Sequence, residues 1–224
     1  MKKIKVFVLA LAAVCLADQL ASAALFVTEV QPSSDHSEDW FELTNAGAAA
    51  VDLENYYWDD NGPSGADGAL FPALTIGAGE SIVIVRTDTA SLPAFVDSWG
   101  GGFTAYSEDI FGGPDTFSGL SSGGDQIEIW DADPNTASSY NLVASAYFGD
   151  APGNGHTFEW NTSGGSLGLS VVGEHGAYGA LHDGEYIFPS SDVGSPGIAT
   201  SVPEPNSMAL VALGLLGLIG TRRW

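Results

Sequence analysis

Short runs of alternating or β-branched residues, separated by clusters of turn-forming residues, recur along the central part of the chain. This pattern predicts an all-β fold, because successive side chains of a strand point to opposite faces of a sheet. No segment carries a long repeat of 3.6 residues, and residues 91–99 are expected to form one helical turn that Pro93 limits. We predict strands at residues 25–31, 39–44, 51–58, 70–76, 80–86, 126–131, 142–148, 156–160, 167–172 and 185–188.

The predicted strand at 39–44 has two faces of different character. Phe41 and Leu43 share one face. Trp40, Glu42 and Thr44 share the other face. This strand therefore has one apolar face and one mixed face.

Other segments are assigned in the same way. In the sequence QIEIW at 126–130, Ile127 and Ile129 are expected to point inward and Glu128 outward. The run IVIV at 82–85 is apolar throughout, which predicts a strand in the middle of a sheet. Residues 99–125 are rich in Gly and Ser and are expected to form a loop, and residues 195–201 are expected to be a linker.

The N-terminus has the three parts of a secretory signal peptide. Three lysines in the first five residues precede an apolar run at 6–17, and the small residues Ala21 and Ala23 follow at the expected signal peptidase site. A helix of 12 residues is about 18 Å long, which is too short to span a bilayer core of about 30 Å. An uncleaved anchor and acylation of Cys15 are the alternatives. Cleavage after Ala23 removes the only cysteine, so disulfides and a thiol nucleophile are not expected.

The C-terminus carries a second targeting signal. The motif Pro203-Glu204-Pro205 precedes an apolar run at 208–220, which is followed by Arg222 and Arg223. This run predicts a short transmembrane segment with the basic cluster on the cytoplasmic side. The arrangement resembles the PEP-CTERM sorting signal, which implies processing by an exosortase-like enzyme in a Gram-negative bacterium. A permanent tail anchor is the alternative.

The segment between the two signals is strongly acidic. The chain has 28 Asp and Glu residues against 6 Lys and Arg residues, while 45% of all residues are apolar, which is enough for a packed core. Only Asp18 and Glu204 among the acids lie outside residues 24–200, and only Arg86 among the bases lies inside, so this body carries a charge of about −25. Solvent cations must screen this charge or bound divalent ions must offset it. Nucleic acid is excluded as a partner, because phosphate binding needs a basic face.

The body resembles the lamin-tail family in the order of its motifs. These motifs are FVTEV at 26–30, DWFELTN at 39–45, AVDL at 50–53, WDD at 58–60, LTIGAGESIVIV at 74–85, GDQIEIWD at 124–131 and GSPG at 194–197. The resemblance implies an immunoglobulin-like β-sandwich, with departures in a Gly-rich insertion after Arg86 and in a loop at 174–185. Bacterial members are typically extracellular modules, so the family implies a fold and a setting rather than an activity. We expect a signal peptide at 1–23, a sandwich at 24–200 and a sorting signal at 201–224.

Two acidic loops are candidate Ca²⁺ sites. Asp131 and Asp133 begin like a calcium loop with Asn135, but an EF-hand needs Gly and Glu where Thr136 and Leu142 stand. A looser site at a strand end is one interpretation, and a solvated hairpin turn is the other.

The second acidic loop contains Asp59 and Asp60, with Asp67 nearby. Adjacent carboxylates repel one another unless a cation lies between them, so this loop is also a Ca²⁺ candidate, with ordinary turn chemistry as the alternative. Ca²⁺ is the one cofactor that the sequence suggests.

Other polar and aromatic residues suggest weaker alternatives. The histidines at 175 and 182, each beside an acid, match no compact zinc motif and are better explained as exposed loop residues. No nucleophile elbow or phosphate loop is present, so no catalytic residues are expected. Four tryptophans fall in or beside strands; alternation points some of them outward, which would allow contact with glycans, but a buried sandwich core is the favoured interpretation. They are Trp40, Trp58, Trp130 and Trp160.

These observations predict a noncatalytic exported module of the cell surface or extracellular matrix, with a structural or adhesive role. A Ca²⁺-dependent glycan- or protein-binding module is the first alternative, and a secreted hydrolase is the second. The expected partners are signal peptidase, an exosortase-like enzyme and either exopolysaccharide or surface proteins. Contact with the membrane is expected only through the C-terminal tail.

Overall fold

The computed structural model describes residues 24–32, 38–63, 68–112, 117, 119–151, 155–181 and 192–201. Several sequence predictions lie outside these residues: the signal peptide, the sorting tail, the strand at 185–188, and His36, Asp67, His182 and Asp183. The processing residues also lie outside them, namely Ala21, Ala23, Pro203, Glu204, Pro205, Arg222 and Arg223. No helix within the described ranges has the length and apolar character needed to cross a membrane.

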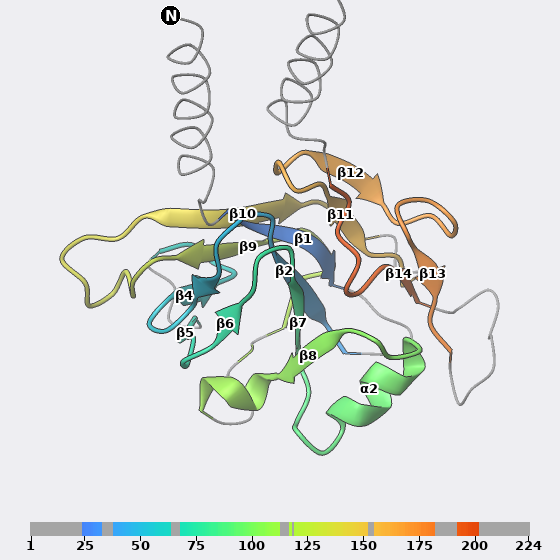
Figure 1. The fold of residues 1–224 in the computed structure, drawn as a ribbon, viewed down its shortest axis with the longest axis horizontal. Helices are drawn as coiled ribbons and strands as arrows, with labels where there is room; N and C mark the ends of the chain where they lie inside the picture. The colour runs from blue at the N-terminus through green and yellow to red at the C-terminus, as the bar shows by residue number, and fades with distance from the viewer. Residues whose placement is uncertain are drawn as a thin grey trace, which may run out of the picture.

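Two sheets pack face to face as a sandwich (Figure 1). The larger sheet contains β1 (Leu25–Gln31), β2 (Trp40–Asn45), β7 (Ser81–Val85), β8 (Thr104–Ser107), β11 (Phe158–Trp160) and β12 (Ser166–Leu169). The smaller sheet contains β4 (Tyr57–Asp59), β5 (Ala69–Leu70), β9 (Asp125–Trp130) and β10 (Leu142–Phe148). The strand orders are β12-β11-β1-β2-β7-β8 and β10-β9-β4-β5, and only the β7–β8 pair is parallel among the described strands.

Two short strand pairs complete the described sheets. They are β3 (Val51–Asp52) with β6 (Thr75–Ile76), and β13 (Tyr178–Gly179) with β14 (Val193–Gly194). The predicted strands at 51–58 and 70–76 are therefore each split in two. A turn at Asn55, which has a φ of 68°, separates β3 from β4. The all-β prediction is confirmed, whereas the continuity of these two strands is wrong.

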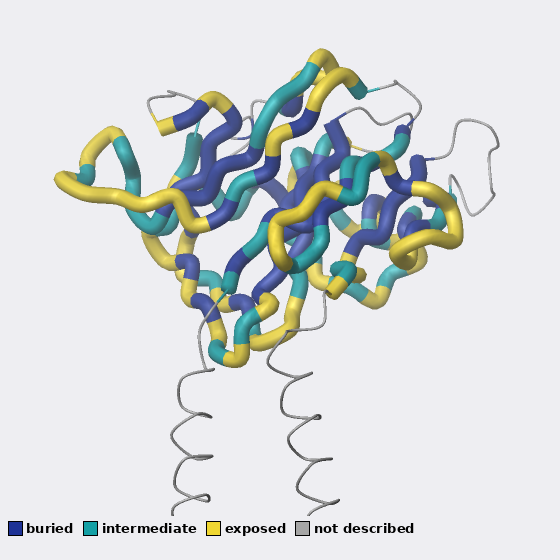
Figure 2. The backbone as a smooth tube through the Cα atoms, turned by 90° about the horizontal axis from the view of Figure 1, so that it is seen from above, coloured by how far each residue is buried: buried dark blue, intermediate teal, exposed yellow. Residues whose placement is uncertain are grey.

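The main core lies between the two sheets (Figure 2). Phe41 and Leu43 of β2 meet Ile127 and Ile129 of β9 there, as the alternation predicts. The ring centroids of Phe41 and Trp58 lie 5.4 Å apart. This packing fixes which face of β2 is left for Trp40, Glu42 and Thr44.

A second apolar cluster covers part of the opposite face of the larger sheet. Helix α2 (Leu92–Ser98) brings Phe95 and the following Trp99 against Trp40, with the two indole ring centroids 5.8 Å apart. Pro93 lies in the first turn of α2, where proline is tolerated, so it does not limit the helix. The run IVIV is thus buried on both faces, as predicted for a central strand.

Residues 99–125 do not form one continuous loop as predicted. They contain β8 and a 3₁₀ helix, η1 (Glu108–Phe111). β8 pairs in parallel with β7, and this pairing depends on the distant partner rather than on a clear local alternation in β8 itself.

Candidate functional site

Three glutamates form a row on the face of the larger sheet away from the main core. Glu29 of β1 is paired directly with Glu42 of β2 on one side and with Glu159 of β11 on the other. Their exposed fractions are 1%, 0% and 3%. Like charges at directly opposed positions destabilise a sheet. The glutamate row therefore requires a local compensation.

A β-bulge in β1 shapes this face. The register shifts between Val27 and Glu29, so Thr28 is the additional residue. Val27 and Val30 both remain in the main core, while Thr28 contacts Glu42 and Glu29 contacts Thr157 on the opposite face. The bulge thus lets two consecutive polar side chains reach the same face.

The C-terminal segment 193–201 supplies hydrogen-bond donors to the glutamate row. The backbone N–H of Ser195 donates to Glu29 Oε1 at 2.7 Å, and that of Gly197 donates to Glu42 Oε2 at 2.6 Å. Thr157 Oγ1 also donates to Glu29 Oε1 at 2.6 Å. Residues 195–201 are therefore not a free linker as predicted, because their first residues are bonded to the sheet.

Two glycines permit this close approach. A side chain on Gly194 would put its Cβ 2.7 Å from Glu29 Oε1 and 2.8 Å from Thr157 Cγ2. Gly197 has a φ of 84°, and a Cβ there would collide with Phe103. The two glycines of the GSPG motif are thus explained by the lack of room for a side chain at either position.

Burial, rather than a counterion, has the largest effect on the pKa values of Glu29 and Glu42. Burial raises the pKa of Glu29 well above its usual range, and the charge of Glu42 adds to this effect. Burial also raises the pKa of Glu42 to about 7, although hydrogen bonds from Thr28 and Gly197 oppose the rise. Arg86 is the only lysine or arginine between residues 24 and 201, and it donates to the Phe117 carbonyl instead.

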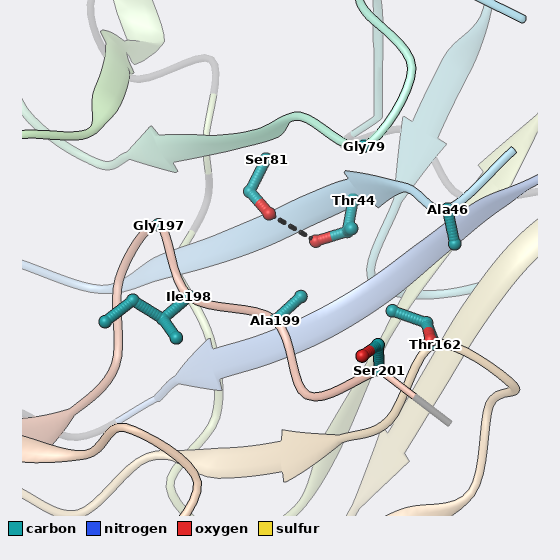
Figure 3. A pocket seen from close by; sticks show the side chains of 9 residues that line it. All are labelled: Thr44, Ala46, Gly79, Ser81, Thr162, Gly197, Ile198, Ala199 and Ser201. Atoms are coloured by element: carbon teal, nitrogen blue, oxygen red, sulfur yellow. Dashed lines mark hydrogen bonds between the residues drawn. The ribbon is translucent and has the colours of Figure 1, made fainter. Parts of the chain in front are cut away.

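A chain of hydroxyl groups connects Glu42 to a surface groove. Thr28 Oγ1 donates to Glu42 Oε1 at 2.5 Å and lies 2.8 Å from Thr44 Oγ1, which lies 2.7 Å from Ser81 Oγ. Figure 3 shows Thr44 and Ser81 in the groove, whose volume is about 430 Å³. The other lining residues are Ala46, Gly79, Thr162, Gly197, Ile198, Ala199 and Ser201. Hydroxyl groups and small side chains thus dominate this groove.

The candidate Ca²⁺ residues Asp131 and Asp133 lie in the loop between β9 and β10. Asp131 accepts hydrogen bonds from the backbone N–H and the side-chain amide of Asn141 at 2.6 and 2.7 Å. Asp133 accepts from the backbone N–H of Asn135 and the hydroxyl of Thr136, both at 2.8 Å. The side chain of Asn141 is the main cause of a lowered pKa for Asp131. Each carboxylate therefore stabilises the turn that contains it.

The other candidate Ca²⁺ residues, Asp59 and Asp60, are buried rather than displayed on an open loop. Asp59 accepts a hydrogen bond from the backbone N–H of Asn61 at 2.6 Å and is paired across the sheet with Glu128. Glu128 faces away from the core as predicted, yet it is buried, and its Oε1 accepts a hydrogen bond from the Tyr147 hydroxyl. Glu128 Oε2 is buried without a hydrogen-bond partner in the described structure.

Metal coordination by a larger cluster is not supported by the described residues. Within those ranges, no three side chains of His, Cys, Asp or Glu are placed so that they could share a metal ion. The glutamate row fits this result, because hydroxyl and backbone donors already point at its oxygens. The four acidic candidates also form two separate groups rather than one site.

The structure decides between the two interpretations of the tryptophans and changes that of His175. Trp40, Trp58, Trp130 and Trp160 are all buried, so the favoured buried-core interpretation is confirmed and none of the four faces outward. Trp40 does point away from the main core, but α2 and Trp99 cover it. His175 is not simply an exposed loop residue, because its Nδ1 lies 3.2 Å from Glu159 Oε2.

Sequence reasoning missed Glu29, Glu159 and Ser195 as site residues. The available signal was a glutamate inside each of two strongly β-forming runs, FVTEV and TFEW, together with the GSPG motif. The alternation rule predicts that such glutamates leave the core, but not that a segment more than 160 residues away covers one of them.

Comparison with known families agrees with this architecture. The family model described as Lamin Tail Domain matches residues 19–144, and that described as the PEP-CTERM protein-sorting motif matches residues 201–223. No curated protein matches the chain.

Proposed function

Because the chain belongs to the Lamin Tail Domain family and ends in a PEP-CTERM sorting motif, we propose that it is a noncatalytic structural or adhesive module of the cell surface. The sorting motif indicates export and surface sorting in a Gram-negative bacterium, with processing by an exosortase-type enzyme. Neither matched family is catalytic. Retention in the exopolysaccharide matrix after removal of the tail is the finer part of the proposal.

The position of the sorting motif relative to the closed sandwich carries this proposal. The Gly197 N–H is bonded to Glu42, and the Thr162 N–H donates to the Thr200 carbonyl at 3.0 Å. The matched sorting motif begins at residue 201. Removal of the tail therefore leaves every described strand and the glutamate row in place. We take residues 24–200 as the module that remains.

The intact mass of the surface-exposed protein tests this proposal. The full chain would be produced in an exosortase-bearing host, and the surface and matrix fractions would be compared with a Glu204→Ala variant. We expect the natural chain to lose the apolar run at 208–220 and to remain in the surface or matrix fraction, while the variant keeps its tail. A surface protein that retains residues 208–220 would contradict the sorting step. A trimmed protein found only in the medium would contradict retention.

A Ca²⁺-dependent binding module is the second candidate, favoured by one observation. Asp59 and Glu128 are opposed acids on β4 and β9, and Glu128 Oε2 is buried without a hydrogen-bond partner in the described part of the chain. Ca²⁺ accepts carboxylate, amide and water oxygens in flexible geometry, so two carboxylates with the Gln126 amide and water could contribute to a site.

Thermal unfolding with Ca²⁺ tests this candidate against Mg²⁺ and ionic-strength controls. A site at 100 times its Kd stabilises the native state by about 2.7 kcal/mol. A saturable Ca²⁺-selective rise in Tm that Glu128→Gln abolishes and Asp133→Asn preserves would support a site at Asp59 and Glu128. An equal response to Mg²⁺, or to salt alone, would remove the candidate.

A further inference from the structure

The hydroxyl of Ser195 lies between two buried carboxylates of the glutamate row. Its Oγ is 3.1 Å from Glu29 Oε2 and 3.3 Å from Glu159 Oε1. A hydroxyl has one proton, so it can donate to only one of these oxygens at a time. If both glutamates were ionised, the other contact would join two oxygens with no proton between them.

One added proton satisfies both contacts. A protonated Glu29 donates through Oε2 to Ser195 Oγ, and the Ser195 hydroxyl then donates to Glu159 Oε1. Glu29 Oε1 stays available for the Ser195 and Thr157 donors. The arrangement of donors and acceptors is therefore complete with one proton and incomplete without it.

We propose that one proton, held by Glu29 and hydrogen-bonded through the Ser195 hydroxyl to Glu159, holds the C-terminal segment 193–201 on the sheet, and that loss of this proton loosens the segment. When the proton is lost, the carboxyl O–H bond breaks and the proton passes to solvent. Two adjoining buried anions then share one hydroxyl donor. The segment that is loosened leads directly into the sorting motif.

Burial and the neighbouring Glu42 favour retention of this proton. Glu42 faces Glu29 from β2, and desolvation by burial, followed by the charge of Glu42, raises the pKa of Glu29. Tyr178 of β13 donates its hydroxyl to the Trp99 carbonyl, and burial raises its pKa to about 12, so it stays neutral. His175 contacts Glu159 from the loop before β13.

The residue immediately before the segment adds one more acid. Asp192 precedes β14 and is buried beside Gly155. Its backbone carbonyl accepts the Ala180 N–H at 2.7 Å. No lysine or arginine of residues 24–201 is available to replace the proton, since Arg86 is engaged with the Phe117 carbonyl.

Amide hydrogen exchange on the mature protein tests the proposal. Protection factors at Ser195 and Gly197, corrected for the intrinsic pH dependence of exchange, would be compared with that at Ile84 of β7. We expect protection at the first two amides to fall about tenfold or more between about pH 6 and about pH 9, while Ile84 changes little. Constant protection at Ser195 and Gly197 over this range would overturn the proposal.

Three variants separate this proton from general charge repulsion. Glu29→Gln places a neutral amide at the same position, and its N–H₂ group can donate to Ser195 as the carboxylic acid does. We expect exchange at Ser195, whose N–H donates to Glu29, to lose its pH dependence in this variant. Glu54→Gln neutralises an exposed glutamate and should keep the natural profile. A natural profile in Glu29→Gln would overturn the proposal, whereas His175→Gln should retain the pH dependence if the glutamates hold the proton.

A direct measurement covers the case in which Glu29→Gln does not fold. The carboxyl carbons of ¹³C-labelled glutamates in the unaltered protein would be followed by NMR during a pH titration. We expect the assigned Glu29 carboxyl to remain protonated at about pH 7, well above the ordinary glutamate pKa of about 4.3. Complete ionisation of Glu29 below about pH 6 would overturn the proposal.

Discussion

Glu29 and Glu42 occupy directly opposed positions on neighbouring antiparallel strands, and both side chains are almost completely buried. Backbone donors from a single segment bind both of them, with the Ser195 N–H on Glu29 and the Gly197 N–H on Glu42. The acids that would otherwise weaken the sheet thus connect its N-terminal strands to the C-terminal end of the module. This arrangement makes the closure of the sandwich sensitive to protonation and to small changes in volume.

The first prediction concerns the pH dependence of stability. The folded pKa is raised to about 7 for Glu42 and to about 6 for Asp39, mainly by burial in both cases. Between the unfolded and folded pKa values the folded state binds more protons, so the free energy of unfolding falls as pH rises. The shift of Glu42 from 4.5 alone corresponds to about 3 kcal/mol at most. Thermal unfolding should therefore show a higher Tm at about pH 5 than at about pH 8.

General repulsion among the acidic groups acts in the same direction, so a control is needed. Repeating the series in high salt screens exposed charges but affects buried ones much less. Glu42→Gln should flatten the remaining pH dependence, and Glu54→Gln should not. A Tm that rises from about pH 5 to about pH 8 would contradict this prediction.

The second prediction concerns the close approach of Gly194 to the sheet. Gly194→Ala places a methyl group within 2.8 Å of Glu29 Oε1 and Thr157 Cγ2, so the segment must move away. We expect the free energy of unfolding in denaturant to fall by about 1–3 kcal/mol. Gly149→Ala is the matched control, since no atom lies within 4 Å of its added Cβ. Equal stability of the two variants would show that Gly194 is not in close contact with the glutamate row.

The third prediction concerns the second apolar cluster. Phe95→Ala removes a buried ring that packs on Trp40 and Trp99, with centroid distances of 6.2 and 6.5 Å. We expect a loss of about 3–5 kcal/mol in the free energy of unfolding and a changed near-ultraviolet circular dichroism. Val172→Ala, at a side chain that is 57% exposed, should change stability by less than about 0.5 kcal/mol. Similar small losses in both variants would mean that α2 is not packed as described.

The fourth prediction concerns Arg86, the only base of the body. Burial raises the pKa of Asp39. The Leu120 N–H, which donates a hydrogen bond to Asp39 Oδ2 at 2.9 Å, and the charge of Arg86 both oppose this rise. In Arg86→Gln the pKa of Asp39 should rise further, so stability should fall more at about pH 8 than at about pH 5. We expect a loss of about 1–3 kcal/mol at the higher pH. Arg86→Lys keeps the charge and should restore the natural pH profile; an unchanged profile in Arg86→Gln would contradict the prediction.

Local patterns were sufficient for the strands whose faces differ clearly. The alternation around Phe41 and around Ile127 assigned these side chains to the core, and β10 has the predicted bounds. The same rule placed Glu42 on the opposite face. It could not reveal that this face is also covered, because the covering residues come from α2, β13 and the C-terminal segment.

The errors share one physical cause, which is tertiary pairing that local sequence does not encode. The sequence of β8 does not predict a strand because its partner β7 supplies the hydrogen bonds, and the Gly and Ser content of residues 195–201 favours a linker. Alternation points some tryptophans outward because it considers only one core. The buried glutamate row forms no conspicuous cluster in the sequence.

The hydrogen bond from Ser195 to Glu29 also has a consequence for the order of folding, because 166 residues separate its two ends. Contacts between such distant parts of a chain form slowly, since a long loop must close first. A chain that crosses the inner membrane N-terminus first presents β1 long before the segment that covers it. The hydrogen bond between Ser195 and Glu29 can therefore form only after almost the whole body of the chain is available to fold.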